Sequence, residues 1–274
     1  MSSVGGRVCV VTGAARGLGQ AIAAALGAAG GRLALCDVLD AELQQTADEL
    51  REQGVEVFAA HCDVSDSASV DAFFAAVEQQ LGPVEALINN AALVPGGPED
   101  EVRRSTHYAY ITTPQPRTSL GFTSAMSDEE WLKYWGVNVH GTFYCTRAAL
   151  RQMEPRGYGR IVNIASIAGL SNYSAHSPHY SATKGAVIAF TRAVAAEVAG
   201  ANVFVNAIAP GGVATPTFDA YLEKLDPEAR NRMFQFVPAG RLGTMEEYAG
   251  LAVYLAGDNH YLAGQVISPN GGMF

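Results

Sequence analysis

The 274-residue chain predicts an α/β fold, in which a doubly wound parallel sheet of about seven strands carries helices on both faces. Short apolar runs alternate with helical stretches along the chain, which is typical of such sheets. Near the N-terminus an apolar run leads directly into a glycine-rich turn and a helix, the pattern of a nucleotide-binding unit. Tyr180 and Lys184 add a candidate pair for proton transfer.

Seven apolar segments supply the predicted strands. They are Val8–Val11, Arg32–Cys36, Val55–Phe58, Ala86–Ile88, Ile161–Ala165, Val203–Ile208 and Val266–Ser268. Two helix starts have the capping-box pattern, a Ser or Thr followed three residues later by Glu, at 127–130 and 244–247. Because no repeat, low-complexity tail or linker divides the chain, residues 1–274 are predicted to form a single domain.

The glycine-rich turn, residues 12–19, follows the first strand with the sequence TGAARGLG. Gly13 can adopt the positive backbone angles of a tight turn, and Gly17 allows close approach to a pyrophosphate. Gly19 lets the next helix pack near the sheet, and the N-terminus of that helix then faces the phosphates. The first 30 residues therefore predict a Rossmann-like dinucleotide site.

Asp37 ends the second predicted strand, eighteen positions after Gly19. A carboxylate there can accept hydrogen bonds from the adenosine ribose hydroxyls and would repel a 2′-phosphate. Because the next residue, Val38, is not basic, NAD is favoured over NADP, although Arg16 in the glycine turn argues for NADP. The alternative role for Asp37 is that of a turn residue or helix cap.

Tyr180 and Lys184 are four residues apart, so on a helix they share one face. A nearby ammonium favours the ionised form of a phenol, which otherwise titrates near pH 10. Tyr180 is therefore a candidate acid/base for a carbinol or carbonyl oxygen.

These motifs, together with Asn89–Ala92, Asn138 and Ser166, resemble the short-chain dehydrogenase/reductase family in its compact single-domain form. The resemblance covers nearly the whole chain, and five signatures occur in the expected order. It implies hydride transfer between a nicotinamide cofactor and a small substrate, but it does not identify the substrate.

The resemblance implies a catalytic tetrad. Tyr180 would transfer the proton, and the Ser166 hydroxyl would donate to the substrate oxygen. Lys184 would lower the pKa of Tyr180 and hydrogen-bond the nicotinamide ribose, while Asn138 would hold a water in a relay toward solvent. Asn89 is expected to be structural, and Ala92, which replaces the family's usual glycine, should need only a small accommodation.

The same resemblance implies the cofactor contacts. Asp63 would bind the adenine amine, Asn90 would hold the strand and the ribose, and the Val213 backbone and Thr215 hydroxyl would lie near the carboxamide. The full set is Gly13, Arg16, Gly17, Leu18, Gly19, Asp37, Asp63, Val64, Asn90, Ala91, Tyr180, Lys184, Pro210, Gly211, Val213 and Thr215.

Two segments depart from the family pattern. Ser166 and Tyr180 are fourteen positions apart, one more than usual, so the loop between them should bulge. It contains His176 and His179, which receive no catalytic role because a loop His is usually solvated. Residues 94–126 form an insertion that should lie near the active-site mouth, beyond the strand ends.

A pocket-shaping role is favoured for this insertion over a surface or subunit-contact role. Its prolines at 95, 98, 114 and 116 argue against a long helix, and its aromatic residues argue against disorder. Residues 216–240 are expected to form a mobile substrate lid. Its apolar candidates are Phe218, Tyr221, Leu222, Met233, Phe234 and Phe236.

The composition disfavours several classes of partner. A net charge of −9 without clustered Lys and Arg disfavours nucleic acid, and no apolar run is long enough for a membrane helix. The four cysteines are scattered without metal spacing, and no targeting segment is evident, which favours reduced thiols, no metal and a cytoplasmic location.

The leading interpretation is NAD-dependent interconversion of a secondary alcohol and a ketone, on an apolar, cyclic or aromatic substrate. One alternative is a 3-ketoacyl-thioester reductase, for which Arg103 and Arg104 could meet a phosphopantetheine carrier, although the acidic chain argues against it. The second alternative is a non-catalytic nicotinamide-binding regulator. Such a protein would not need Ser166, Tyr180 and Lys184 together. The resemblance implies a homotetramer or homodimer.

Overall fold

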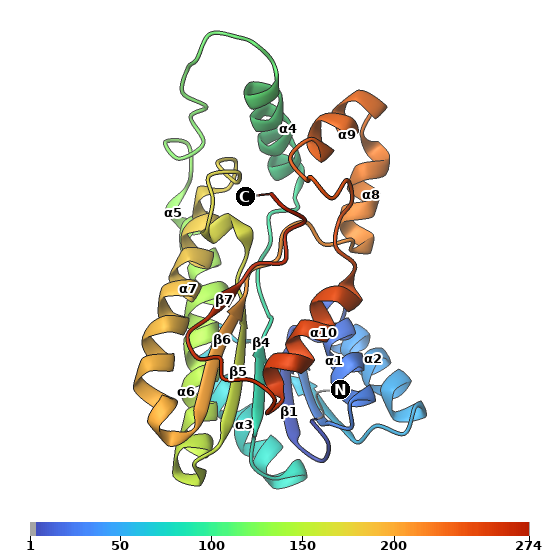
Figure 1. Cartoon of the computed structure of the whole chain (residues 1–274), viewed down its shortest axis with the longest axis vertical. Helices are drawn as coiled ribbons and strands as arrows, with labels where there is room; N and C mark the ends of the chain where they lie inside the picture. Colours follow the sequence, from blue (N-terminus) through green and yellow to red (C-terminus); the bar gives the residue numbers. More distant parts are fainter. Residues whose placement is uncertain (1–3, 274) are drawn as a thin grey trace.

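The computed structural model describes residues 4–273, which contain a seven-stranded parallel sheet (Figure 1). The strand order is β3-β2-β1-β4-β5-β6-β7, so the chain reverses direction across the sheet between β1 and β4. Such a reversal is the point at which open parallel sheets bind ligands. The strands are β1 (Val8–Thr12), β2 (Arg32–Asp37), β3 (Val57–His61), β4 (Ala86–Asn89), β5 (Gly159–Ile164), β6 (Val203–Ile208) and β7 (Val266–Ile267).

Ten α-helices accompany the sheet in the described residues. They are α1 (Gly17–Ala28), α2 (Asp40–Glu52), α3 (Ser67–Leu81), α4 (Pro98–Thr112), α5 (Asp128–Trp135), α6 (Thr142–Met153), α7 (Pro178–Val198), α8 (Pro216–Lys224), α9 (Pro227–Phe234) and α10 (Met245–Ala256). A π-helical turn, Gly136–Gly141, joins α5 to α6.

The helices bury both faces of the sheet, which confirms the predicted doubly wound fold. One core contains side chains of α3, α6 and α7, such as Phe74, Cys145 and Val194. The opposite core contains side chains of α1, α2 and α10, such as Ile22 and Leu43. Strands covered on both sides read as continuous apolar runs, and β1 is buried at all five positions.

The predicted strands all occur, with small shifts in their ends. β3 starts at Val57 rather than Val55, and β7 has only two residues. The capping box of α10 forms completely, because Thr244 and Glu247 each accept the other's backbone N–H. The capping box of α5 forms only in part: Ser127 Oγ accepts from the Glu130 N–H, but no Glu130 contact back to Ser127 is found among the hydrogen bonds of the helix start.

The insertion contains a helix of 15 residues, α4, so the expectation that its prolines prevent a long helix was wrong. The prolines instead bound the helix. Pro98 occupies the first turn, where no intrahelical N–H bond is lost, and Pro114 follows the C-cap residue Thr113. The carboxylate of Asp100 accepts the N–H groups of Gly96 and Gly97, which closes the helix start.

Figure 1 shows α4, α8 and α9 together at the upper end of the molecule, with α10 and the sheet below them. Tyr108 of α4 packs on a buried cluster formed by Tyr221, Leu222 and Met233 of α8 and α9. The insertion and the segment 216–240 therefore form one structure, which we call the roof. Among the helices of residues 4–273, none has the length and apolarity needed to cross a membrane.

Candidate active site

The glycine turn after β1 needs glycine for two different reasons. Gly13 has φ +64°, and a Cβ there would lie 2.7 Å from Ala91 Cα. A Cβ on Gly19 would lie 2.0 Å from the Gly13 carbonyl oxygen. Gly17 has φ +59°, with nothing within 4 Å of the Cβ position, so its surroundings are open. The turn thus combines close packing at its ends with an open N–H-rich face at the start of α1, which suits a phosphate group.

Asn90 fixes this turn to the end of β4. Its Nδ2 donates to the carbonyl oxygens of Thr12 and Gly13 at 3.0 and 2.9 Å. Thr12 Oγ1 in turn accepts the N–H groups of Asn90 and Ala91, each at 3.0 Å. Sequence reasoning missed Thr12, although a hydroxyl residue that ends an otherwise apolar strand was the available signal. Ala92 does not have a positive φ, so an alanine at this position needs only a small accommodation, as expected.

Asp37 lies at the end of β2, beside the glycine turn. Its carboxylate accepts the backbone N–H groups of Ala15 at 3.0 Å, Val38 at 2.8 Å and Leu39 at 3.1 Å. Asp37 therefore shapes the turn between β2 and α2 and holds the glycine turn at the same time. Arg16 does not join this group; its side chain is 70% exposed and lies 3.6 Å from Glu42.

The other predicted adenine-side residues follow β3. Asp63 Oδ1 accepts from the backbone N–H and the hydroxyl of Ser65, at 2.9 and 2.7 Å. Val64 is buried against the π-helical turn, where a Cβ on Gly141 would lie 2.7 Å from Val64 Cγ2. Leu18 packs on the core beside α1. Their contacts with a cofactor stay predictions.

Three of the four predicted catalytic residues come together where β5 ends and α7 begins. Tyr180 is the third residue of α7, and Lys184 follows one turn later. Ser166 Oγ accepts the Ala168 N–H at 3.1 Å, so its own proton remains to be donated. Lys184 Nζ donates to the Ile164 carbonyl oxygen at 2.7 Å. The Pro210 carbonyl accepts from Ile167 N–H at 2.9 Å and joins this loop to the end of β6.

Burial governs the ionisation of this group. It raises the pKa of Tyr180, and the neighbouring Ser166 hydroxyl lowers it in part. It also lowers the pKa of Lys184 to about 8. The sequence predicted that the Lys184 ammonium would lower the pKa of Tyr180. Here that ammonium is 5.8 Å from the centre of the Tyr180 ring and is bound to a carbonyl instead, so the phenol is held in its neutral, proton-donating form.

Asn138 lies in the π-helical turn, a distortion that often marks functional sites. Its Oδ1 accepts the Leu93 N–H at 2.7 Å, and its Nδ2 donates to the Leu93 carbonyl and to Thr183 Oγ1, both at 3.1 Å. The Asn138 side chain thus connects the segment after β4 to Thr183 of α7, which precedes Lys184 in the sequence. A relay water at Asn138 stays a prediction.

The turn after β6 reaches α8. Thr215 Oγ1 accepts the Phe218 N–H at 3.3 Å and caps α8, while Val213 pairs with Gly243 in an isolated parallel bridge. Gly211 packs against the chain near the C-terminus, where a Cβ would lie 2.8 Å from Asn270 Cα. The turn is therefore well fixed, and its contact with a carboxamide stays a prediction.

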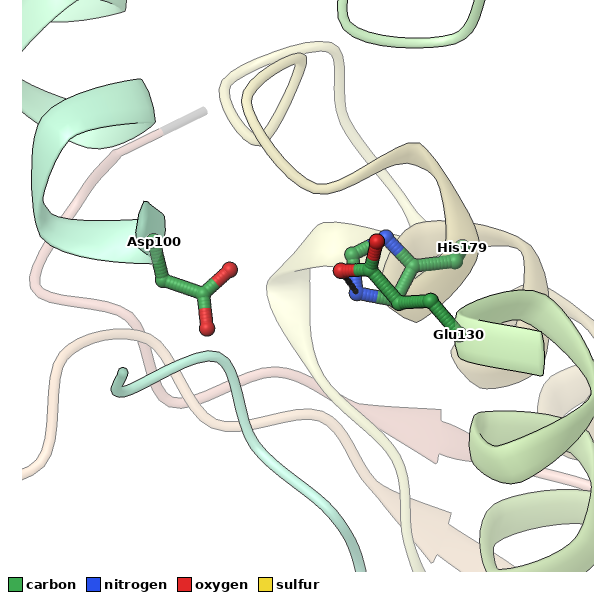
Figure 2. A group of neighbouring side chains, drawn as sticks. All are labelled: Asp100, Glu130 and His179. Carbon is green, nitrogen blue, oxygen red and sulfur yellow. Dashed lines mark ion pairs between the residues drawn. The ribbon is translucent and has the colours of Figure 1, made fainter. Parts of the chain in front are cut away.

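The two histidines of the loop before Tyr180 are both buried, so the expectation of solvated side chains was wrong. His176 Nδ1 lies 3.4 Å from His107 Nδ1 on α4, and burial lowers the pKa of His176 to about 3. His179 is completely buried, and neither ring nitrogen has a hydrogen-bond partner. Figure 2 shows His179 beside Glu130, with the carboxylate of Asp100 facing them.

Aromatic side chains join the roof to this loop. Tyr108 of α4 stacks on Phe236 with ring centres 6.2 Å apart, and Tyr173 lies 5.8 Å from the same Phe236 ring. Arg104 is buried, donates to the Pro95 carbonyl at 2.9 Å and lies 4.9 Å from the centre of the Tyr221 ring. Aromatic contacts thus hold the roof against the loop that precedes Tyr180.

Arg103 is also engaged, since its Nη2 donates to Asp100 at 2.8 Å and to Glu130 at 2.7 Å. Of the two arginines that the sequence offered for a phosphopantetheine phosphate, Arg103 is thus paired with two carboxylates and Arg104 is buried. On its outer side Arg103 lines a pocket of about 470 Å³ between α4 and the start of α5. That pocket is lined by Pro98, Glu99, Val102, Arg103, Leu120, Gly121, Phe122, Ala125 and Glu130.

Comparisons with known proteins agree on one family. Residues 7–226 match the family described as short chain dehydrogenase. The chain is 33% identical to the 3-oxoacyl-acyl-carrier-protein reductase FabG of Pseudomonas aeruginosa, over 99% of both chains. A variant of actinorhodin polyketide ketoreductase, solved with NADPH, has a TM-score of 0.84 and 35% identity over 97% of each chain. Levodione reductase has a TM-score of 0.81 and 30% identity, over 98% of this chain and 97% of the other.

Proposed function

The chain belongs to the short-chain dehydrogenase family and is an oxidoreductase, and from that premise we propose that it uses NAD(H) to interconvert a secondary alcohol and a ketone. We propose a free substrate that is apolar, cyclic or aromatic, with Tyr180 as the acid/base. The observation that carries the proposal is the partly buried Tyr180 phenol next to the Ser166 hydroxyl, with Lys184 one turn further along α7.

The residues around Tyr180 suit a proton transfer to a carbonyl oxygen. The Ser166 hydroxyl, which accepts the Ala168 N–H and lies next to Tyr180, can donate its proton to the substrate oxygen and stabilise the developing charge. Tyr180, kept neutral by burial, can then donate its own proton to that oxygen. The cofactor, when bound, accepts or supplies the hydride. Alcohol oxidation requires the reverse proton transfer, from the carbinol to the deprotonated phenolate of Tyr180.

The residues at the predicted cofactor site suit a dinucleotide. The open, positive-φ Gly17 and the tightly packed Gly13 and Gly19 leave the N-terminus of α1 accessible to a pyrophosphate. The Asp37 carboxylate at the end of β2 supports NAD, because it would repel a 2′-phosphate. Arg16, the residue that favours NADP, faces Glu42. The NADPH bound to actinorhodin ketoreductase supports the opposite choice.

The aromatic contacts of the roof favour a substrate that is free and apolar. Its inner contacts are aromatic, through Tyr108, Tyr173 and Phe236. Arg103 is paired with two carboxylates and Arg104 is buried, which disfavours both as contacts for a carrier phosphate. Levodione reductase, by its name, acts on a dione, and it is similar to this chain over almost its full length.

A 3-ketoacyl-thioester reductase is the second candidate, because the similar proteins include FabG and a polyketide ketoreductase. This candidate predicts that acyl-thioesters on a carrier protein are reduced faster than free ketones. The intact group of Ser166, Tyr180 and Lys184 argues against the regulator interpretation.

We further propose a cytoplasmic homotetramer or homodimer. The four cysteines are free and buried, which supports a reducing compartment. Light scattering coupled to size exclusion tests the assembly, and a monomer at all concentrations would refute it.

The test of the proposed function is a panel of linear, cyclic and aromatic ketones and acyl-thioesters, assayed with NADH and NADPH by absorbance. Faster turnover of cyclic or aromatic ketones with NADH is expected. Faster turnover of carrier-bound thioesters would favour the second candidate, and cofactor binding without any turnover would contradict both.

A further inference from the structure

A buried group of charged and polar residues connects the insertion to the helix that carries Tyr180. We call Asp100, Arg103, Glu130 and His179 the charge chain. Arg103 Nη2 lies 2.8 Å from Asp100 Oδ1 and 2.7 Å from Glu130 Oε1, and the same Glu130 oxygen lies 3.6 Å from His179 Nε2 (Figure 2). The chain thus crosses from α4 to α5 and from α5 to α7.

Glu130 takes part in this chain instead of completing a helix cap. The sequence pattern at 127–130 predicts a full capping box, in which the glutamate would accept the Ser127 N–H. In the structure only the Ser127 side chain caps, through the Glu130 N–H at 3.1 Å. The Glu130 carboxylate faces Arg103 and His179. Its strongest contact is therefore with the insertion.

The charge chain ends at His179, beside the proton-transfer residue Tyr180. His179 immediately precedes Tyr180 in the first turn of α7. Its buried ring packs edge-on against Tyr134, with ring centres 4.1 Å apart. Burial, with smaller contributions from the carboxylates of Asp100 and Glu130, raises the pKa of Tyr134 to about 12. A movement of Glu130 would therefore be transmitted to the turn that holds Tyr180.

Within the charge chain Asp100 and His179 are buried, whereas Arg103 and Glu130 are partly exposed and line the pocket beside α4. Neither ring nitrogen of His179 has a hydrogen-bond partner, and burial lowers the pKa of His179, so Glu130 contacts a neutral ring at 3.6 Å without a hydrogen bond. Nε of Arg103 also has no hydrogen-bond partner. The side chains of Asp100 and Arg103 are 11% and 15% exposed. Breaking a buried ion pair by removing one partner is costly, because the other charge is left uncompensated. The bridge by Arg103 is thus the element on which the arrangement depends.

A metal ion is the competing explanation. Asp100, Glu130 and His179 each offer a ligand atom, and these atoms lie within 4.8 Å of one another. However, the guanidinium of Arg103 already stands between the two carboxylates and supplies the positive charge. A metal ion would have to displace it.

We propose that the insertion helix α4 positions Tyr180 through the charge chain, with Arg103 and Glu130 as positioning residues. This inference rests on the proposed function only for the role of Tyr180. The insertion then acts on the rate of proton transfer for every substrate, in addition to any role in shaping the pocket.

The change Arg103→Met tests the proposal, because it removes the bridging cation and keeps an unbranched side chain. The first readout is hydrogen exchange of the amides in residues 181–184, which should become faster than in the wild type. The second is kcat, which should fall between about 10- and 100-fold for all substrates, since small misplacements of reacting groups have effects of this size. The KM for the cofactor should stay within about twofold.

The matched control is Arg151→Met. It removes an exposed ion pair with Asp71 between α6 and α3, away from the charge chain, and should change neither readout. Glu130→Gln is the second variant, in case Arg103→Met does not fold. It keeps the shape of the side chain but weakens the bridge, so its effects should have the same direction and be smaller.

The pH profile separates positioning from a general loss of structure. Without Arg103, the carboxylates of Asp100 and Glu130 repel each other when both are ionised. Both readouts of Arg103→Met should therefore recover as the pH falls and one carboxylate binds a proton. The double variant Arg103→Met/Glu130→Gln should lose this pH dependence, because only one charge remains, and should stay below the wild type because the bridge is absent. The other charged or titratable groups that face the chain are Arg104, His107, Tyr134, His176 and Tyr180.

Three results would overturn the proposal. One is exchange in residues 181–184 that is the same in Arg103→Met and in the Arg151→Met control. Another is a loss of kcat that differs strongly between substrates. The third is activation of the EDTA-treated wild type by Zn²⁺ or Mn²⁺ that disappears in His179→Gln, which would identify a metal site. An inactive wild type would show that the proposed function fails. Hydrogen exchange requires no turnover, so it tests the positioning proposal separately from the proposed function.

Discussion

Burial of Lys184 gives a prediction whose size follows from the structure. The side chain is 3% exposed, and its pKa falls from 10.5 to about 8 because the ammonium loses its hydration. Below pH 8 the lysine is charged in the folded and unfolded states, so the folded protein bears the full cost of burying the charge. At about 1.4 kcal/mol per tenfold change, that cost is roughly 3 kcal/mol.

The cost disappears as the pH rises from 8 to above 10.5, because the folded protein releases the proton first. The wild type should therefore gain roughly 2–3 kcal/mol of stability relative to Lys184→Met between pH 7 and pH 10. The comparison removes effects that do not depend on pH, such as the lost hydrogen bond to Ile164. It also removes the titration of most other tyrosines and cysteines.

Urea unfolding of both proteins at pH 7 and pH 10, at one protein concentration, measures this difference. The same pair in the Tyr180→Phe background removes the ionisation of the adjacent phenol. A stability difference between wild type and Lys184→Met that is the same at both pH values would refute the assignment of a lowered pKa to Lys184. Turnover of Lys184→Met should be low at both pH values.

Three further predictions concern the cofactor groove and the roof. Asp37→Ala should weaken NAD binding and relax discrimination against NADP, and titration calorimetry showing a wild-type preference for NADP would contradict it. Gly19→Ala should cost about 1–3 kcal/mol of stability and weaken the cofactor, because its Cβ would lie 2.0 Å from the Gly13 carbonyl. Gly250→Ala, in open space on α10, is its control and should be neutral or stabilising in a thermal melt. Tyr108→Ala should raise the KM of bulky ketones and leave the KM of NADH unchanged; equal changes in both would contradict the role of the roof.

The parts of the fold that local patterns determine were predictable from the sequence. The buried strands appear as apolar runs, and the turn after β1 needs glycines because of its backbone angles and its contact with Ala91. The capping box at Thr244 was also predictable, since both of its hydrogen bonds are local. The backbone angles of the turn and the hydrogen bonds of the cap lie within a few residues of their signals, whereas Ala91 is distant in the sequence.

The remainder depends on contacts between distant segments. Prolines around α4 were taken to oppose a helix, but their positions at its ends are compatible with one. Glu130 was expected to cap α5 and instead pairs with Arg103, 27 positions earlier in the chain. His179 was expected in solvent and is buried by Tyr134. The Lys184 ammonium was expected to act on Tyr180, yet burial sets the ionisation of both.

Comparison of Tyr180→Phe with the wild type tests the central claim most directly. Cofactor binding is followed by NADH fluorescence, and turnover is measured with the best ketone of the panel. Because the ring remains and only the transferable proton is removed, NADH affinity should be preserved while kcat falls about 10²- to 10⁴-fold. Turnover that is unchanged in Tyr180→Phe would show that this phenol does not transfer the proton.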